Sequence, residues 1–192
     1  MRTPAFRRLP RAVREQQMLD AAVAVFSRRG YHDASMDEIA ERAGVSKPMV
    51  YAYLGAKDEL FIACLHREAT KLVEAVVAAI RPDVPPDVQL GNGLRAFFGF
   101  VAAHRDGWAV LYRQARGQEP FAGEVGRMRD RMAELVAGLL ARSGAAAGEA
   151  VPRAYAIVGA GESLADWLAD HVDEQPDATT ARLMGLLRFS GS

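Results

Sequence analysis

A positive charge and two phenol groups lie within one short stretch of the sequence, at Lys47, Tyr51 and Tyr53. A lysine ammonium group can bind a phosphate oxygen or the edge of a guanine, and a tyrosine hydroxyl can donate a hydrogen bond to a phosphate. Between them, Pro48 and Met49 offer apolar surface that can contact the methyl group of a thymine. The chemistry available to this stretch is therefore contact with the backbone and the base edges of a nucleic acid.

Two short helices joined by a glycine turn are predicted to position these side chains. Ser35 is a favourable N-cap residue, and Glu38, three places later, completes a capping box. Gly44 can adopt the positive φ that a sharp turn needs. Ser46 is expected to cap the second helix, and Pro48 lies in its first turn, where a missing N–H costs nothing.

The spacing of small and aliphatic residues predicts how the two helices cross. Ala40 leaves room at the crossing, Gly44 follows four places later at the turn, and Val50 fills the gap six places beyond. This arrangement is typical of a helix-turn-helix, whose second helix enters the DNA major groove with its N-terminal end. An ordinary helical hairpin with half-buried tyrosines has the same spacing, so the spacing alone leaves both interpretations open.

The stretch resembles the N-terminal domain of TetR-family transcriptional regulators, in which a first helix ending in Gly-Tyr precedes I-A-x-x-A-G-V-S-x-x-x-x-Y-x-Y-F-x-x-K-x-x-L. The residues that match in register are Gly30, Tyr31, Ala34, Ser35, Ile39, Ala40, Ala43, Gly44, Val45, Ser46, Tyr51, Tyr53, Lys57 and Leu60. The chain departs from the pattern in three places. Leu54 replaces the usual Phe, Met49 replaces a Thr or Ser, and Gly55-Ala56 replaces a better helix cap.

The resemblance implies an all-α protein of about nine helices, with an N-terminal three-helix DNA-binding domain and a C-terminal helical domain that binds a ligand and dimerises. Lys57 is similar to the family's phosphate-binding lysine, and Met49 lacks the polar group that usually contacts a base. Leu54 should be a packing substitution, and Asp58 and Glu59 should support the start of the fourth helix. The residues expected to contact DNA are Ser35, Met36, Ser46, Lys47, Pro48, Met49, Tyr51, Tyr53 and Lys57.

The charge of the chain is balanced overall but unevenly distributed. Lysines and arginines number 24, as do aspartates and glutamates, which taken alone argues against a nucleic-acid partner. Residues 1–14, however, contain five arginines and no acid, whereas from residue 145 onward seven acids face three arginines. Only the N-terminal part is therefore expected to meet DNA, although a basic N-terminal segment can also be merely solvated.

The composition is that of an ordinary globular protein, with 50% hydrophobic and 25% charged residues. No apolar run approaches the length of a membrane span, and the N-terminus has no apolar signal-peptide core. The single cysteine, Cys64, cannot form an internal disulfide and suits a reducing compartment. We therefore expect a cytoplasmic protein without a membrane partner, in which Cys64 is a core residue.

Apolar periodicity and the Pro/Gly breaks divide the chain into helices. Besides the two in the helix-turn-helix, helices are expected over 11–29, 57–80, 86–104, 106–116, 120–143, 149–172 and 176–188. The expected domains are a flexible basic arm (1–10), a helix-turn-helix domain (11–56) and an effector-binding and dimerisation domain (57–192). Glycines such as Gly93, Gly99 and Gly107 fall inside these helices and are expected to mark kinks or close packing.

Aromatic residues are concentrated in the C-terminal half of the chain. They can form an ordinary packed core, or they can line a cavity for a small, mostly apolar effector, as the resemblance implies. The candidate ligand-binding residues are Phe97, Phe100, His104, Trp108, Leu111, Tyr112, Tyr155 and Trp167. Candidate polar groups at the edge of the cavity are His104, Tyr112, Arg113, Gln114 and Glu162.

The last two helices are expected to form the dimer interface, because the equivalent pair in the TetR family makes a four-helix bundle with the partner. Small residues at Ala156, Gly159, Ala160 and Gly161 allow close approach of helices. Apolar surface is expected from Leu164, Trp167, Leu168, Leu183, Leu186 and Leu187. The alternative is that these side chains only close the core of the monomer.

No catalytic or metal-binding motif stands out in the sequence. The four histidines are scattered, without the spacing of a zinc site, and there is neither a phosphate-binding Gly-Lys-Ser/Thr loop nor a Gly-x-Ser-x-Gly elbow. We therefore expect a protein that is not an enzyme and needs no cofactor or metal. The prediction is a homodimeric repressor that binds a palindromic operator in double-stranded DNA and is released by an unknown small effector. The alternative is a helical small-molecule binding or interaction protein whose N-terminal domain no longer recognises a DNA sequence, and Met49 is its best support.

Overall fold

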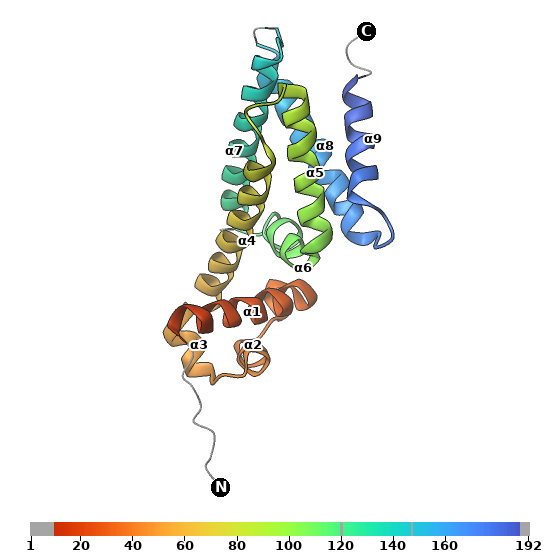
Figure 1. Ribbon diagram of the computed structural model, residues 1–192. Helices are drawn as coiled ribbons and strands as arrows, with labels where there is room; N and C mark the ends of the chain where they lie inside the picture. Colours follow the sequence, from red (N-terminus) through yellow and green to blue (C-terminus); the bar gives the residue numbers. More distant parts are fainter. Residues whose placement is uncertain (1–9, 120, 147, 189–192) are drawn as a thin grey trace. The chain divides into compact units, whose positions relative to one another are not determined.

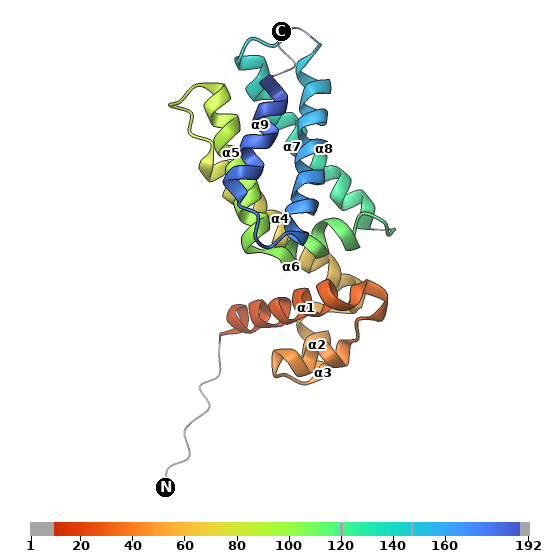
Figure 2. The same ribbon diagram turned by 90° about the vertical axis from the view of Figure 1, so that its right-hand side faces the viewer.

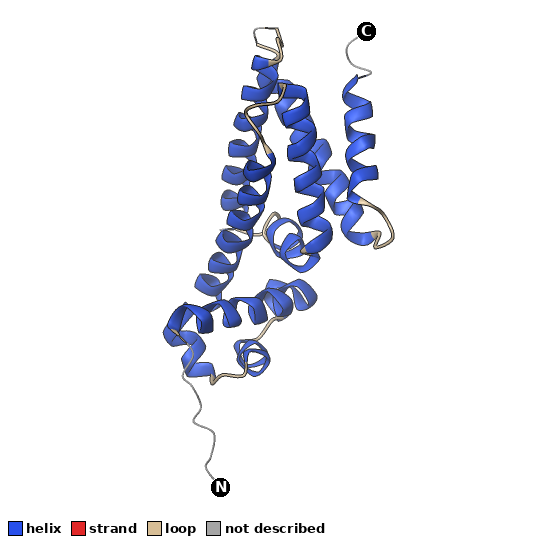
Figure 3. Ribbon diagram, in the orientation of Figure 1, coloured by secondary structure: helices blue, strands red, loops and turns tan. Residues whose placement is uncertain are grey.

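The computed structural model describes residues 10–119, 121–146 and 148–188, and these ranges contain helices and loops without a β-strand (Figure 3). Within them lie nine α-helices and one π-helix, η1 (Figure 1). Their bounds are α1 (Arg11–Asp33), α2 (Met36–Ala43), α3 (Lys47–Leu54), α4 (Lys57–Ala79), α5 (Pro86–Ala103), α6 (Arg105–Trp108), η1 (Ala109–Gln114), α7 (Phe121–Arg142), α8 (Ala150–Asp170) and α9 (Pro176–Arg188). The predicted all-α architecture is confirmed. The expected arm over residues 1–10 lies, except for Pro10, outside the described ranges.

The chain forms two compact units, an N-terminal unit up to His66 and a C-terminal unit from Arg67 onward. The division falls inside α4, which begins in the first unit and ends in the second. The boundary expected from the sequence lies before Lys57, at the start of this helix. The first turns of α4 belong to the N-terminal unit because Leu60, Phe61 and Cys64 are fully buried in its core.

The core of the N-terminal unit forms where α1 packs on the start of α4. Met18, Ala22, Val25 and Phe26 recur on one face of α1, and each is fully buried. The ring of Phe26 meets that of Phe61 edge to face, with 4.9 Å between the ring centroids. This apolar joint gives α2 and α3, which pack against α1 and each other, a fixed support.

Gly30 interrupts α1 rather than ending it. Its φ of 77° is not helical, yet the chain continues for one more turn to Asp33. The N–H of Ala34 then bonds to the carbonyl oxygen of Gly30 at 3.2 Å. A residue with a side chain would be strained at this φ, so glycine fits here because it allows a kink.

Helices α5 to α9, with the second part of α4, build the C-terminal unit. Helix α5 packs against α7, α8 and α9, and α9 also packs on α8, as Figure 2 shows. Phe98, Trp108 and Leu168 lie at the centre of its core. Proline marks two of the helix starts, because α5 begins at Pro86 and α9 at Pro176, positions where the missing N–H costs nothing.

The segment 106–116, for which one helix was predicted, has a different structure. It consists of α6, a single turn, followed by η1, whose i→i+5 hydrogen bonding makes it wider than an α-helix. Gly107 in α6 lies so close to buried Glu68 of α4 that a Cβ would stand 2.5 Å from the carboxylate. The expected close packing at Gly107 is thus confirmed. None of the described helices combines the length and apolar composition that a membrane crossing requires.

Candidate nucleic-acid interface and ligand cavity

The turn between α2 and α3 has the geometry that the sequence predicted. The hydroxyl oxygen of Ser35 accepts a hydrogen bond from the N–H of Glu38 at 3.1 Å. Gly44 adopts the left-handed conformation, with φ 65° and ψ 33°, and Val50 is fully buried at the joint. The Glu38 carboxylate lies 3.5 Å from Nε of Arg29, so this side chain pairs with α1 instead of completing the capping box.

The N-terminal end of α3 is exposed and carries a positive charge. Ser46, Lys47 and Pro48 are all exposed. The backbone carbonyl of Ser46 accepts hydrogen bonds from α3, but in the described part of the chain its hydroxyl makes no capping hydrogen bond, which corrects the expected side-chain cap. The ammonium group of Lys47 donates to Asp37 at 2.8 Å. This ion pair is exposed, so a phosphate can compete for the lysine at little cost.

The remaining candidates on α3 lie at different depths. Tyr51 is exposed, whereas Tyr53 and Met49 are half-buried. The Arg11 guanidinium lies 5.0 Å from the centroid of the Tyr53 ring, and Nη1 of Arg14 lies 3.4 Å from the sulfur of Met49. Two arginines from the start of α1 therefore border α3. In the sequence they stand out only as members of the basic N-terminal segment.

Two departures from the family pattern have structural explanations. Leu54 is buried, so its replacement of Phe changes core packing. The carboxylate of Glu59 accepts a hydrogen bond from the N–H of Ala56 at 2.8 Å and thereby caps the start of α4 directly. Met36 is also buried, so DNA can reach only the backbone at the start of α2 at this position.

Lys57 is the first residue of α4, where free backbone N–H groups favour an anion. Its ammonium group donates to the carbonyl oxygen of His32 at 2.8 Å and lies 4.9 Å from the centroid of the Tyr31 ring. The Tyr31 hydroxyl in turn donates a hydrogen bond to the Asp58 carboxylate. These contacts hold the lysine beside the helix terminus and leave donors for a further acceptor.

A cavity of about 80 Å³ opens within the C-terminal unit. Its wall is almost entirely apolar and is formed by side chains of α4, α5, α7 and α8 and by Trp108 and Tyr112. The residues of this wall include Leu72 and Val76 of α4 and Met132 of α7. Methionine side chains are flexible, so this wall can adjust its shape to a ligand.

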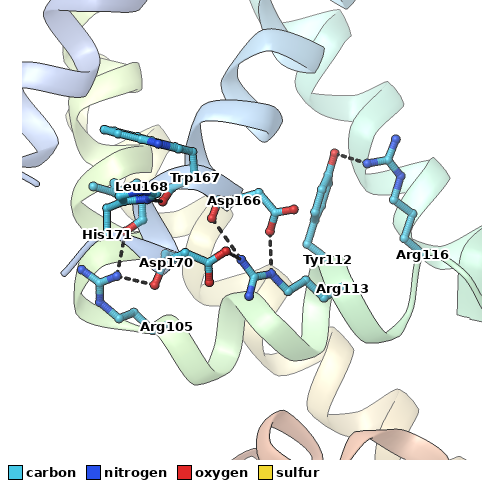
Figure 4. A network of polar contacts seen from close by, with 10 residues as sticks. Arg105, Tyr112, Arg113, Arg116, Asp166, Trp167, Leu168, Asp170 and His171 are labelled. Carbon is cyan, nitrogen blue, oxygen red and sulfur yellow. Dashed lines mark hydrogen bonds and ion pairs between the residues drawn. The ribbon is translucent and has the colours of Figure 1, made fainter.

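Polar groups line the cavity wall where α7 and α8 meet η1. The carboxylate of Glu162 accepts hydrogen bonds from the Tyr112 hydroxyl at 2.7 Å and from Nε of Arg129 at 3.0 Å. Nη2 of Arg129 also donates to Glu162. The Tyr112 hydroxyl also accepts a hydrogen bond at 2.7 Å from Arg116, an exposed side chain that is not part of the cavity wall (Figure 4). These four side chains are called the polar cluster below.

Two members of the polar cluster, Tyr112 and Arg129, have raised pKa values. Burial, followed by the hydrogen bond to Glu162, raises the pKa of Tyr112 to about 12, so the hydroxyl is neutral at pH 7. The hydrogen bond to Glu162 also raises the pKa of Arg129 above its usual range. Glu162 is buried and Arg129 is partly buried, so the ion pair between them is partly shielded from water.

Three of the eight predicted ligand-binding residues, Phe97, Trp108 and Tyr112, line the cavity. Phe100 and Leu111 are buried in the core, and His104 stacks on Phe100 with 4.4 Å between ring centroids. Tyr155 and Trp167 are exposed on α8. Among the residues that the structure describes, these five do not line the cavity. The roles of all eight in ligand binding remain predictions.

Arg129, a residue that no sequence motif marks, lines the cavity from α7. Of the predicted edge groups, Tyr112 and Glu162 line the cavity, whereas Arg113 faces away from the polar cluster. It donates to the carboxylates of Asp166 at 2.8 Å and Asp170 at 2.7 Å, which attaches η1 to α8 (Figure 4). These two hydrogen bonds raise the pKa of Arg113 further above its usual range.

The chain matches the sequence models of two protein-domain families. Residues 86–188, more than half of the chain, match "Tetracyclin repressor-like, C-terminal domain". Residues 18–64 match "Bacterial regulatory proteins, tetR family". The second range contains the predicted helix-turn-helix.

Curated relatives include a transcriptional activator and a transcriptional repressor. The chain is 42% identical over 113 residues to the activator FasR of Mycolicibacterium smegmatis, a match that covers 59% of this chain and 52% of the relative. It is 32% identical over 126 residues to the repressor SCO4008 of Streptomyces coelicolor, covering 59% of this chain and 62% of that protein. The chain therefore spans only about half to three fifths of the length of these relatives.

Solved structures match nearly the whole chain. A TetR-like transcriptional regulator from Rhodococcus sp. RHA1 is 49% identical, with a TM-score of 0.86, and the match covers 96% of this chain and 100% of the other. The regulator FadR of Bacillus subtilis, determined in complex with stearoyl-CoA, has the same fold at 21% identity, with a TM-score of 0.78 and coverage of 90% and 96%. The family matches, the helix-turn-helix and the architecture agree, and the chain belongs to the TetR family of transcriptional regulators.

Proposed function

We propose that the protein is a homodimeric repressor that binds a palindromic operator and leaves it when a small, mostly apolar effector occupies the cavity. The exposed start of α3 is the observation that carries the DNA-binding part. It presents Lys47, Pro48 and Tyr51 on a helix that is held from behind by buried Val50 and Leu54. Further phosphate contacts are expected from Lys57 and from the basic segment of residues 1–10.

The cavity supports the effector-binding part of the proposal. Its wall is almost entirely apolar, so burying the apolar surface of a ligand there is favourable. Interiors are normally packed with few voids larger than a water molecule, so a retained cavity of this kind suits a ligand. The complex of Bacillus subtilis FadR with stearoyl-CoA further favours a ligand with an apolar chain.

The proposed coupling runs through α4, which carries Lys57 at its start and Leu72 and Val76 on the cavity wall. An effector that binds one position of this helix better than another shifts the population of the DNA-binding conformation. Residues 11–56 are then the DNA-binding part, and residues 57–192 bind the effector and dimerise. We expect this regulator to act in the cytoplasm.

Exposed apolar side chains on α8 and α9 support the proposed dimer. Val151, Tyr155 and Trp167 are exposed on α8, and Leu186 is exposed on α9. A twofold dimer presents two equivalent heads, as a palindromic operator requires. Leu168 and Leu183 were also expected at this surface, but they are buried in the core of the C-terminal unit.

Selection of bound sequences from random duplex DNA tests the proposed function. At near-physiological salt, the purified protein should recover a palindrome with two half-sites about one DNA turn or somewhat more apart. Retention that is sensitive to salt but independent of sequence would favour a protein whose head no longer recognises a sequence. A reporter gene placed behind the recovered operator then separates repression from activation, the two modes represented among the relatives.

A further inference from the structure

The polar cluster carries more positive than negative charge. The charged groups that act on the hydroxyl of Tyr112 are Arg116, Arg129 and Glu162. Two guanidinium groups against one carboxylate leave one positive charge, and the tyrosine is neutral. Asp130, next to Arg129 on α7, does not supply the missing negative charge to the cavity, because it is exposed and its carboxylate accepts a hydrogen bond from Tyr155 on the outer face of α8.

Arg129 has hydrogen-bonding capacity to spare. Its Nε and Nη2 donate to Glu162 and Tyr112, while its other terminal nitrogen, Nη1, has no protein acceptor among the residues that the structure describes. Arg129 also lines the cavity. A guanidinium group in this setting matches the two oxygens of an acidic group, which it can bind with paired hydrogen bonds.

We propose that the effector is an amphipathic molecule with one acidic head group, which binds Arg129, and an apolar body that lies beside Trp108 and Leu72. This inference rests on the proposed function and names the chemical class of the effector. The head group competes with Glu162 for Arg129. Arg116, already bonded to the Tyr112 hydroxyl, then balances the charge of Glu162. With one acidic ligand bound, the positive and negative charges of the cluster are equal.

Other head groups suit the cluster less well. An alcohol forms no ion pair with Arg129, and an amine would bring a second positive charge to the cavity wall beside it. Placing an unpaired charge in an apolar, partly enclosed site is costly. The apolar wall accepts the chain of any of these molecules equally, so the head group decides between them.

Calorimetry with three compounds that share one alkyl chain tests the inference. Decanoate, decanol and decylamine are titrated into the full-length protein below their aggregation concentrations. Decanoate should bind at least about tenfold more tightly than either of the others, as expected for a charge-assisted bond. Equal binding of decanol, or tighter binding of decylamine, overturns the inference, and so does the binding of none of the three.

Variants of the two central residues should change decanoate affinity in opposite directions. Arg129→Met should weaken decanoate about tenfold and leave decanol unchanged, whereas Glu162→Gln removes the competing carboxylate and should strengthen decanoate. The matched control is Arg131→Met, an exposed position on the same helix. Because Arg129→Met leaves Glu162 unpaired and can reduce folding, Arg129→Lys, which keeps the charge, is measured beside it and should retain part of the preference.

The outcome separates this inference from the proposed function. If both Arg129→Met and Glu162→Gln weaken decanoate and decanol alike, the cluster is structural and the inference fails. If a neutral apolar compound releases the operator, the proposed function stands without the acidic head group. If the protein selects no operator, the proposed function fails whatever the calorimetry shows.

Discussion

At the scale of single residues, Lys57 offers the clearest test of a phosphate contact. Its ammonium group lies at the start of α4, held by the carbonyl oxygen of His32. Lys57→Ala should weaken binding to all DNA sequences to a similar extent, without changing the preferred site. The slope of log K against log salt concentration should fall by about the amount that corresponds to one phosphate contact. The measurement is fluorescence anisotropy on operator and scrambled duplexes over a range of salt.

Tyr51→Ala should also weaken DNA binding, because an exposed phenol on α3 can donate to a nearby phosphate, but it should leave the salt slope unchanged because the phenol is neutral. Arg81→Ala is the control, since Arg81 is paired with Asp83 in the loop after α4. An unchanged salt slope in Lys57→Ala would count against the assigned role.

The raised pKa of Tyr112 predicts that the protein loses stability at alkaline pH. Its pKa is about 12 in the folded protein and 10.0 as a free side chain. Between these values the folded state holds a proton that the unfolded state has released, so the free energy of unfolding falls as pH rises. Burial and the hydrogen bond to Asp58 raise the pKa of Tyr31 to about 12 as well, so it acts in the same direction.

Urea unfolding between pH 9 and pH 12 checks this sign. The contribution of Tyr112 should be fully present below about pH 10 and lost as pH rises through about 12. Tyr112→Phe should show a smaller fall over this interval, with Tyr31 accounting for part of what remains. The same pH dependence in both proteins would refute the link to Tyr112.

At the scale of elements, the contact between α6 and α4 should tolerate no added atom. A Cβ on Gly107 would lie 2.5 Å from the carboxylate of buried Glu68. That carboxylate is held by Arg67 at 2.8 Å and Lys71 at 3.0 Å, so moving it disturbs both ion pairs. Gly107→Ala should therefore lower the free energy of unfolding by about 1–3 kcal/mol.

Gly99→Ala is the matched control, because a Cβ at Gly99 in α5 meets no atom within 4 Å. Alanine favours a helix over glycine, so this variant should gain up to about 1 kcal/mol. Urea unfolding of the two variants gives both values. A Gly107→Ala protein as stable as the wild type would show that α6 can move away from α4 freely.

The elements show which features could be predicted from sequence. The helix-turn-helix and the starts of α5 and α9 were predictable because glycine permits the positive φ of a sharp turn and proline restricts φ at a helix start. The π-helix η1 was not, since an apolar pattern over one or two turns is the same for an α- and a π-helix. Arg129 could not be identified either, because it stands among Arg127, Asp130 and Arg131 on α7 and only the fold places it against Glu162.

At the scale of the whole molecule, the exposed apolar face of α8 and α9 should decide the oligomeric state. Trp167 and Leu186 are large and exposed, at 37% and 62%. Trp167→Glu and Leu186→Glu should each convert the proposed dimer to a monomer, because a buried unpaired carboxylate is costly. Light scattering after size exclusion measures the mass.

Val77→Glu provides the comparison, since Val77 is exposed on α4 rather than on the last two helices. It should leave the mass unchanged. A wild-type protein that elutes as a monomer, or a dimer that survives both α8 and α9 variants, would contradict the proposed interface.

The central claim is that the cavity and the DNA-binding head are coupled in one protein. The most direct measurement is the affinity for the selected operator with and without a saturating amphipathic compound. The compound is one that calorimetry has shown to bind the protein. Coupling of ordinary strength predicts an operator Kd that rises about 5- to 150-fold, and operator DNA should weaken the compound's binding by the same factor. If the saturated protein binds the operator as tightly as the free protein, ligand-controlled release is contradicted.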